Sequence, residues 1–329
     1  MHPISIGIPV YNQAATIADA IESVLAQNEK PREIVVSENH STDGTREIVE
    51  RYRDRVRIVR PPEHIGMAAN WNFCVRACEG EWVGLCSGDD RLLPNYVKSF
   101  QMATTLDPSA VFVMGGWEIA DEVNGTVELH HLLSMGTITR PPRTLGMLLR
   151  GPKASFAAFS FRRTTFESIG GYDPAFHLNQ DWMFQFEAAK HGSFIKVDEL
   201  VARYRIRNRP DLAQRRVPLY LQDMTLYLSE RIWQATAHGV ASAEVNRAAR
   251  AVWRHILRYI RVQGAELDAN CEVRLREVAR RLGEENAWRR WQSGTWTPGD
   301  PGAFQRWFRH RLRNVYTLVR HGRPTQSRL

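Results

Sequence analysis

Residues 82–90 have the sequence Trp-Val-Gly-Leu-Cys-Ser-Gly-Asp-Asp, an apolar run that leads directly into two adjacent carboxylates. The run Trp82–Cys86 has the length and composition of a strand buried on both faces, as in a parallel sheet. Asp89 and Asp90 would then stand at the carboxyl end of that strand, where ligands bind in such sheets. Adjacent carboxylates repel each other unless a positive group is bound. A divalent cation that bridges diphosphate oxygens would satisfy them; the alternative is a simple helix cap before Leu92.

Strand-like and helix-like segments alternate on the N-terminal side of this run. The predicted strands are Ile4–Val10, Glu33–Ser37 and Val56–Val59, and the predicted helices are Thr16–Ala26, Arg46–Tyr52 and Met67–Cys78. This alternation, with short connections, predicts an α/β fold with a parallel sheet covered by helices on both faces.

The pattern becomes mixed after residue 110 and purely helical after residue 205. The expected strands are Val111–Trp117, Val127–Leu132, Phe156–Phe161, Phe194–Val197 and Val201–Tyr204, with a helix at Asp181–His191. Further helices are expected at Pro218–Ala237, Ala243–Val262 and Val273–Leu282, and a last basic helix from Ala303 to Arg320. We therefore predict an α/β domain over residues 1–210 and a helical, Arg-rich region over residues 211–329.

Charge differs sharply between these two parts. The chain of 329 residues has a net charge of +8, made up of −4 over residues 1–205 and +12 over residues 206–329. This asymmetry indicates an acidic partner for the C-terminal part, for which a membrane surface, a phosphorylated substrate and a nucleic acid are the options. The helix at 303–320 has aromatic residues on its apolar face and arginines elsewhere, a pattern typical of helices that lie in a membrane interface. The alternative is that it packs on its own protein.

The sequence gives no other sign of a membrane or an oxidising compartment. No apolar stretch approaches the roughly 18 residues of a spanning helix, and the N-terminus lacks a secretory pattern. The four cysteines, Cys74, Cys78, Cys86 and Cys271, are expected to be buried thiols. We expect a cytoplasmic protein. A peripheral position on the inner face of the cytoplasmic membrane is the alternative.

Polar residues follow the first two predicted strands. Pro9, Tyr11 and Asn12 offer a rigid turn, an aromatic face and an amide, which suit a nucleobase but equally suit an ordinary strand-to-helix turn. Glu38 could accept a hydrogen bond from a base, whereas Asp43 is better explained as a helix cap.

Asp181 follows Asn179-Gln180 at the start of a predicted helix. A carboxylate there could act as a general base if the site raised its pKa toward neutrality, or it could simply favour the helix N-terminus.

These segments resemble one family when they are taken together. The segments are Pro9-Val10-Tyr11-Asn12, Ser37-Glu38-Asn39-His40-Ser41-Thr42-Asp43-Gly44-Thr45, Gly66 with Asn70-Trp71-Asn72, Gly80-Glu81 before Ser87-Gly88-Asp89-Asp90, and Gly170-Gly171-Tyr172-Asp173 with Gln180-Asp181. In this order and spacing, across residues 3–205, they closely resemble the family 2 glycosyltransferases. The resemblance implies the GT-A fold, which is Rossmann-like with a mostly parallel central sheet, here followed by an α-helical C-terminal extension.

The resemblance also implies a reaction and a set of roles. A sugar would pass from a nucleoside diphosphate donor to an acceptor hydroxyl, of a glycan or lipid-linked glycan, with inversion and by direct displacement. The implied donor-binding residues are Pro9, Tyr11, Asn12, Glu38, Asn39, Asp43, Gly66, Asn70, Ser87, Asp89, Asp90 and Arg207. Asp89 would hold a divalent cation, Mn²⁺ or Mg²⁺, and Asp181 would take the acceptor's proton.

Two departures from the family pattern weaken the expected metal site. Many relatives have a carboxylate where this chain has Ser87, and many have a His where it has Arg207. We therefore expect weak metal binding, with Arg207 or Arg205 partly stabilising the diphosphate.

Three other readings remain. One is a protein of this fold that binds nucleotide sugars but has lost catalysis, and another is a nucleotidyltransferase, for which the loop after the first strand lacks the usual Gly-rich, basic sequence. The third is a nucleic-acid-binding protein, which we do not expect because no basic and aromatic recognition motif accompanies the arginines.

Overall fold

The computed structural model describes residues 2–132, 135–206 and 210–296, with side chains omitted for 210–215. The chain divides into two compact units, which are described separately. The first consists of Met1–Ala175 with Gln180–Ile206, and the second of Phe176–Asn179 with Arg207–Leu329. The predicted helix at 303–320 lies outside the described residues.

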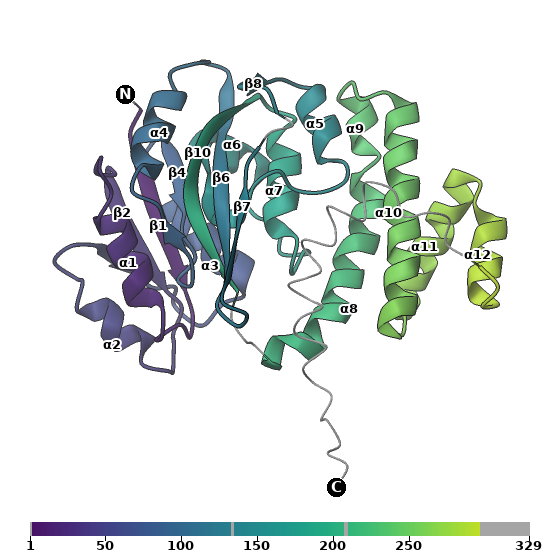
Figure 1. Cartoon of the computed structure of the whole chain (residues 1–329), viewed down its shortest axis with the longest axis horizontal. Helices are drawn as coiled ribbons and strands as arrows, with labels where there is room; N and C mark the ends of the chain where they lie inside the picture. Colours follow the sequence, from purple (N-terminus) through teal and green to yellow (C-terminus); the bar gives the residue numbers. More distant parts are fainter. Residues whose placement is uncertain (1, 133–134, 207–209, 297–329) are drawn as a thin grey trace, which may run out of the picture. The chain divides into compact units, whose positions relative to one another are not determined.

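The first unit is built on one sheet whose N-terminal half is parallel (Figure 1). Its strands are β1 (Ile4–Val10), β2 (Glu33–Glu38), β3 (Arg57–Val59) and β4 (Trp82–Leu85), in the order β3-β2-β1-β4. Every residue of β1 and β4 is buried, as expected of apolar strands covered on both faces.

The second half of the sheet is mixed. Its strands are β9 (Phe159–Arg162), β6 (Ala110–Asp121), β10 (Ser193–Ile206) and β5 (Arg91–Leu92), with β7 (Thr126–His130) paired to β6 and β8 (Ile138–Thr139) paired to β10. β9 is antiparallel to both β4 and β6, whereas β10 is parallel to β6.

Two sequence predictions need correction in this half. The two strands expected at 194–197 and 201–204 form one strand, β10, whose register shifts between Lys196 and Leu200. The intervening polar residues look like a turn in the sequence, but the strand continues past them with a bulge. The strand expected from Phe156 begins as a 3₁₀ turn at Phe156–Ala158.

Short helices complete the first unit. They are α1 (Ile17–Leu25), α2 (Thr45–Glu50), α3 (Met67–Ala77), α4 (Tyr96–Ala103), α5 (Arg143–Leu148), α6 (Arg163–Ile169) and α7 (Gln180–Ala188). α1 buries Ile17, Ala20, Ile21 and Val24, the one-face spacing on which its prediction rested. α4, α5 and α6, each of at most eight residues, were not predicted.

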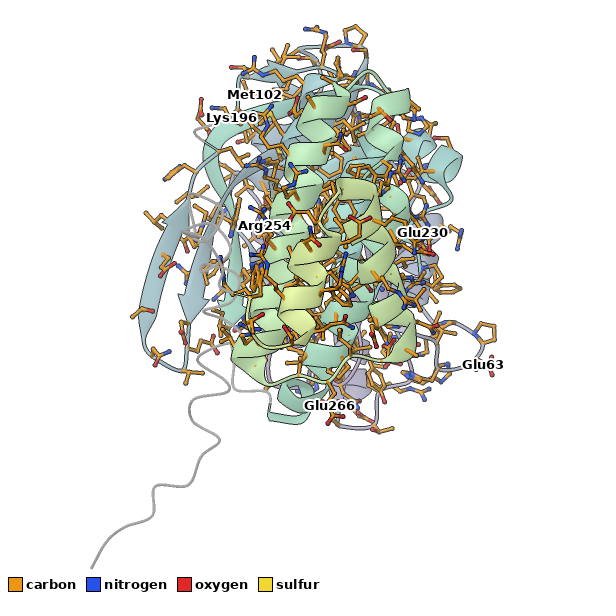
Figure 2. The ribbon with its side chains drawn as sticks, turned by 90° about the vertical axis from the view of Figure 1, so that its right-hand side faces the viewer. Glu63, Met102, Lys196, Glu230, Arg254 and Glu266 are labelled. Carbon is orange, nitrogen blue, oxygen red and sulfur yellow. The ribbon has the colours of Figure 1, made fainter. Side chains whose placement is uncertain are left out.

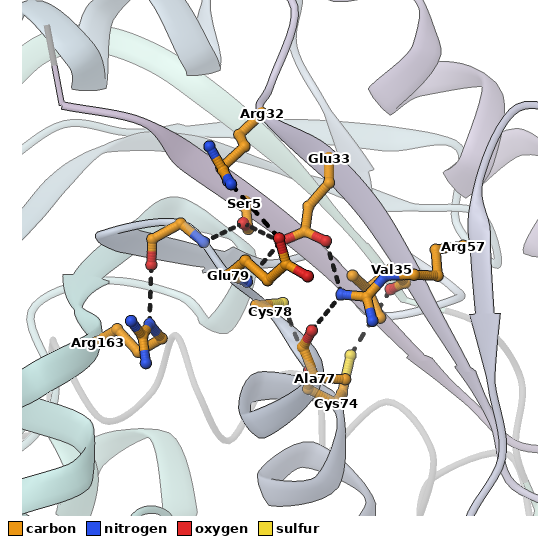
Figure 3. A network of polar contacts seen from close by, with 11 residues as sticks. Ser5, Arg32, Glu33, Val35, Arg57, Cys74, Ala77, Cys78, Glu79 and Arg163 are labelled. Carbon is orange, nitrogen blue, oxygen red and sulfur yellow. Dashed lines mark hydrogen bonds and ion pairs between the residues drawn. The ribbon is translucent and has the colours of Figure 1, made fainter.

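A polar network fastens the amino-terminal end of this sheet (Figure 3). Glu33, the first residue of β2, accepts hydrogen bonds from the Ser5 hydroxyl at 2.6 Å and the Glu79 backbone N–H at 2.5 Å. Its other oxygen pairs with Arg57 of β3 at 2.7 Å. Ser5 in turn accepts from the Gly80 N–H at 2.8 Å. One carboxylate thus joins β1, β2, β3 and the turn after α3.

The second unit is helical. It contains α8 (Pro210–Leu226), a π-helical turn at Tyr227–Arg231, α9 (Gln234–Ala237), α10 (Ser242–Gln263), α11 (Ala269–Leu282) and α12 (Glu285–Gln292). The single helix expected over 218–237 therefore begins earlier and is interrupted, and α12 was not predicted. Among the helices described, none is long and apolar enough to cross a membrane.

Caps define the ends of α10 and α11, and a tryptophan and an ion pair connect the helices of this unit. Asp268 caps α11 by accepting from the Cys271 N–H at 2.8 Å, and Gly264 and Gly283 end α10 and α11 in left-handed conformations. The buried Trp253 of α10 donates to the Leu275 carbonyl of α11 at 3.0 Å. Arg254, labelled in Figure 2, pairs with Glu284 at 2.8 Å.

Candidate functional site

The carboxyl ends of β1, β2 and β4 meet at one edge of the sheet. Val10 lies opposite Glu38 in the β1–β2 ladder, and the Cys86 N–H donates to the Gly7 carbonyl at 2.9 Å. Because the three strands are parallel, the loops that follow them share this edge. The predicted site residues of all three loops are therefore neighbours in space.

Asn12 and Asp43 join the first two of these loops. The Asn12 N–H donates to the Ser41 hydroxyl at 3.1 Å, and the Asn12 side chain accepts from the Thr42 N–H at 2.8 Å. Asp43 accepts from the Ala14 N–H and the Thr45 N–H, each at 3.0 Å. Burial opposes the effect, but these hydrogen bonds and that of the Thr45 hydroxyl lower the pKa of Asp43. Both side chains hold the loops in shape.

Glu38 and Asn39 are buried and brace the same edge. The Glu38 carboxylate accepts from the Ser41 N–H at 2.6 Å and from Arg60 at 3.1 Å. Asn39 forms two hydrogen bonds with the backbone of Ile65, at 2.7 and 3.0 Å. The loop that carries Gly66 is thereby fixed beside the end of β2.

Tyr11 and His64 form an exposed aromatic pair above this frame. Their ring centroids are 4.3 Å apart with planes at 38°, and Tyr11 is 42% exposed. Gly66, two residues after His64, is also exposed, and a Cβ there would meet nothing within 4 Å. Pro9, by contrast, is buried within β1. The sequence analysis missed His64, whose position two residues before Gly66 was its only signal.

Two asparagines of α3 connect this edge to the rest of the unit. Asn70 accepts from the Ser37 hydroxyl at 2.6 Å. Asn72 donates to the Tyr172 carbonyl at 2.9 Å and accepts from its N–H at 2.8 Å. Asn70 was predicted to bind the donor; in the structure it is buried and holds β2 to α3.

The turn after β4 places two carboxylates very differently. Ser87 donates to Asp89 at 2.6 Å, and Asp89 is half-buried. Asp90 is fully buried and accepts from the Arg205 N–H at 3.3 Å. Burial, reinforced by the charge of Asp89, raises the pKa of Asp90 well above its usual range. Of the two residues, only Asp89 is therefore partly exposed to solvent.

Arg205, near the end of β10, supports this turn through hydrogen bonds. Its Nε donates to the Asp89 carbonyl at 2.5 Å, and its Nη1 pairs with Asp19 of α1 at 3.0 Å. The guanidinium is buried, so it supports the turn through the backbone. Arg207, the other predicted cation, lies outside the described residues.

Asp181 comes from the first turn of α7. The residue is buried, and its Oδ1 accepts from the Trp182 N–H at 2.8 Å. The nearby Tyr172 hydroxyl is buried; burial, with the charge of Asp181 adding to it, raises the pKa of Tyr172 well above its usual value.

One family model matches this chain. The family is described as Glycosyl transferase family 2, and the match covers residues 5–170, about half of the chain and all of the strand-end loops. The chain belongs to glycosyltransferase family 2.

Relatives and solved structures agree with this family. An uncharacterised glycosyltransferase of Rickettsia felis (strain ATCC VR-1525 / URRWXCal2) is 29% identical over 187 residues, which are 56% of this chain and 31% of that protein. The chain thus spans about a third of that relative's length. S. aureus TarS 1–349, solved in complex with UDP-GlcNAc, superposes with a TM-score of 0.67 at 16% identity, over 98% of this chain and 93% of that one. Mannosyltransferase PcManGT of Pyrobaculum calidifontis, in complex with GDP-Man and Mn²⁺, gives 0.51 at 17% identity, over 98% and 88%.

These likenesses establish the GT-A fold for this family 2 glycosyltransferase, as its sequence motifs implied. In this chain the sheet has the strand order β3-β2-β1-β4-β9-β6-β10-β5, with a parallel first half and a mixed second half.

The donor set at Asp89 fits a cation shared with a substrate. No group of three acidic, His or Cys side chains suited to a metal occurs among the described residues. Asp89 nevertheless offers one carboxylate oxygen beyond the one that Ser87 occupies. Mg²⁺ is commonly held by one or two carboxylates together with substrate phosphates and water. The arrangement suits such a shared ion and does not suit a closed protein site.

Proposed function

We propose that this chain transfers a sugar from a nucleoside diphosphate donor to an acceptor hydroxyl, with inversion, at the shared edge of β1, β2 and β4. The single observation that carries the proposal is the position of Asp89. It is the one residue of the Asp89–Asp90 pair that is partly exposed, and it follows a buried strand of a family 2 GT-A sheet. The TarS and PcManGT structures reported above contain UDP-GlcNAc and GDP-Man, which supports a nucleotide sugar as the donor.

Tyr11 and His64 are suited to the nucleobase. Their exposed rings offer an apolar face for a planar base, and the open space over Gly66 leaves room for it. Four other predicted residues shape the site instead of contacting the donor, because hydrogen bonds to loop backbone already engage their polar atoms. Asn12, Glu38 and Asp43 hold the loops after β1 and β2, and Asn39 holds the loop at Ile65. Asn70 and Ser37 keep this frame attached to α3.

Asp89 and Ser87 would hold the cation against the donor diphosphate. When bound, Mg²⁺ or Mn²⁺ would neutralise negative charge that develops on the departing nucleoside diphosphate. Arg205 fixes the Asp89 backbone, so that the carboxylate is positioned before the donor arrives. With one protein carboxylate at hand, we expect this ion to bind weakly without nucleotide.

Asp181 is the proposed general base. It would accept the proton of the acceptor hydroxyl while the hydroxyl oxygen forms a bond to the anomeric carbon. The bond from that carbon to the diphosphate oxygen breaks on the opposite face, and the nucleoside diphosphate leaves. The Trp182 N–H, which donates to Asp181, orients the carboxylate.

Donor binding can be tested by thermal shift against UDP-, GDP- and dTDP-sugars with and without Mn²⁺ or Mg²⁺. A ligand at a hundredfold excess over its Kd stabilises the folded state by about 2.7 kcal/mol. We expect one nucleotide class to raise the melting temperature, and Asp89→Asn to remove the metal-dependent part of the rise. Asp54→Asn, at an exposed position, is the control.

Two outcomes would contradict the proposal, one in that screen and one in an assay of donor hydrolysis and sugar transfer. A rise that is identical for wild type and Asp89→Asn would exclude Asp89 as the cation's ligand. Donor binding without any transfer or hydrolysis of the sugar would favour the alternative, a protein that binds nucleotide sugars without catalysis, for which Ser87 in place of a carboxylate is the specific observation.

The acceptor and the cellular location are proposals from the family and from the sequence. We propose a glycan or lipid-linked glycan acceptor, and contact with the inner membrane surface through residues 303–320. Deleting residues 303–329 should then move the protein from the membrane fraction to the soluble fraction; an unchanged distribution would refute that contact.

A further inference from the structure

The Gln13 side chain lies against the turn that carries Asp89. A Cβ on Gly88 would lie 2.2 Å from the Gln13 Oε1 and 2.9 Å from a methyl group of Val10. The Gln13 amide is therefore packed on the backbone of Gly88, which directly precedes Asp89 in the turn. A side chain of the loop after β1 thus contacts the turn after β4. The sequence analysis did not single out this glutamine.

The backbone of Gln13 is fixed on both sides. Its N–H donates to the hydroxyl of Thr45, the first residue of α2, at 2.8 Å. Its carbonyl accepts from the N–H groups of Thr16 and Ile17, each at 3.0 Å, at the start of α1. The side chain therefore extends from a fixed point, and it crosses from the loop after β1 to Gly88.

The two ends of the Gln13 amide differ. The Oε1 atom is buried and has no hydrogen-bond partner in the described part of the chain. The Nε2 group makes no hydrogen bond among the described residues either, but it is not buried. A buried amide oxygen without a donor costs free energy. An apolar side chain of the same length would pack against Val10 and Gly88 without that cost, so contacts within the protein do not account for an amide here.

An anion on the open side of the amide would account for it. An amide N–H donates strongly to a phosphate oxygen. Under the proposed function, Ser87 and Asp89, on either side of Gly88, hold the cation against the donor diphosphate. The backbone N–H groups of residues 12–14 already donate to side chains of the neighbouring loop. The Gln13 Nε2 is not engaged in this way, so it is available to a diphosphate at the turn.

We infer that Gln13 binds the donor, with Nε2 donating a hydrogen bond to a diphosphate oxygen of the nucleotide sugar. The inference rests on the proposed function, because it takes the Asp89 turn as the place of the diphosphate. It adds a neutral hydrogen-bond donor to a turn whose own side chains include two carboxylates, Asp89 and Asp90. It also gives Gly88 a role, because a side chain at that position would displace the amide.

Calorimetry of the full-length protein with UDP, GDP and dTDP in the presence of Mg²⁺ tests this contact. Gln13→Met keeps the length of the side chain but removes the amide, and should weaken binding of the nucleoside diphosphate about tenfold. Gln13→Glu adds a negative charge beside the diphosphate and should weaken binding about a hundredfold. Gln101→Glu, the same change at another partly buried position, on α4, should bind like wild type.

The outcomes separate the role of Gln13 from that of the site. If the wild-type protein binds none of the three nucleoside diphosphates, the proposed function is contradicted and the inference falls with it. Equal affinities of wild type and Gln13→Met for a nucleoside diphosphate that does bind would overturn the inference alone. Tighter binding by Gln13→Glu would show that this side chain serves the cation instead of the diphosphate, and would overturn it too.

Thermal melting distinguishes a ligand contact from a structural role. Because the amide has no hydrogen-bond partner to lose among the described residues, Gln13→Met should keep or raise the melting temperature while it weakens nucleotide binding. A large fall in the melting temperature would show that Gln13 supports the fold, and would overturn the assignment.

Discussion

Neither the backbone conformation nor the packing at Gly66 requires a glycine. Its φ is −60°, and a Cβ would meet nothing within 4 Å. Gly66→Ala should therefore leave the melting temperature unchanged or slightly raised, because alanine has less freedom in the unfolded chain. If the nucleotide lies against this loop, the added methyl group should weaken nucleoside diphosphate binding about tenfold or more. Calorimetry of the variant provides the test.

Gly136→Ala is a suitable control for this substitution, since its nearest Cβ contact would be 3.7 Å away and its loop follows no site strand. Unchanged affinity in Gly66→Ala would show that the loop does not touch the nucleotide. The comparison isolates a ligand contact from any effect on folding.

The positions of the candidate residues could be predicted from the sequence, but their long-range hydrogen bonds could not. Asp89 and Asp90 are adjacent and look alike in the sequence, yet one is half-buried and the other fully buried. Arg205, 116 residues from Asp89 along the chain, donates to the Asp89 carbonyl and to the Asp90 carboxylate, and local spacing carries no information about such a partner. Asn72 likewise reaches Tyr172 across 100 residues. The functional roles of all these residues remain predictions.

At the scale of elements, the Glu33 network should matter most for stability. Glu33→Gln removes the charge that pairs with Arg57. With its carbonyl oxygen kept toward Ser5 and Glu79, the glutamine turns a donating NH2 group toward the Arg57 guanidinium. These hydrogen bonds are exposed or only partly buried, so the change should cost about 0.5–1.5 kcal/mol, the net contribution of an ordinary hydrogen bond. We expect a loss of that size in the free energy of unfolding, measured by urea denaturation.

Glu29→Gln makes the same change at an exposed position and should cost little. Equal losses in the two variants would show that the network adds nothing to stability. Because Glu33 lies at the opposite end of β2 from the strand-end loops, nucleotide binding by the folded Glu33→Gln protein should be normal.

Elements were predictable where one physical signal dominated. β1 begins and ends where its apolar run does, and α1 follows its one-face pattern. β10 was divided in two because its polar middle resembles a turn, while pairing with β6 on both sides carries the strand through. α5 and α6 were missed because helices of six and seven residues gain their stability from packing, which a sequence window does not show.

At the scale of the whole molecule, one histidine should make the helical unit sensitive to acid. His255 of α10 is buried; burial, with the charge of Arg258 adding to it, lowers its pKa from 6.5 to about 3. Below pH 6.5 the unfolded chain therefore binds a proton that the folded chain does not. Stability is fully present above pH 6.5 and should fall by about 2 kcal/mol by pH 5 from this group.

Urea denaturation at pH 7.5, 6 and 5 measures this loss. His255→Gln cannot titrate, so its stability should depend less on pH over that range even if it is less stable throughout. His238→Gln, at an exposed site, should keep the wild-type dependence. The same pH dependence in all three proteins would assign the acid sensitivity to other groups.

The brace from Arg205 to the Asp89 turn also sets an order of events during synthesis on the ribosome. β1, β2, β3 and β4 can pair as soon as the first 85 residues have emerged, because every partner is then present. The turn at Asp89 must wait for a residue 116 positions later, which at 5–20 residues per second is a delay on the order of ten seconds. During that interval the nascent chain carries an unbraced pair of carboxylates. A cation or nucleotide in the cell would therefore meet a braced turn at Asp89 only after Arg205 has been made.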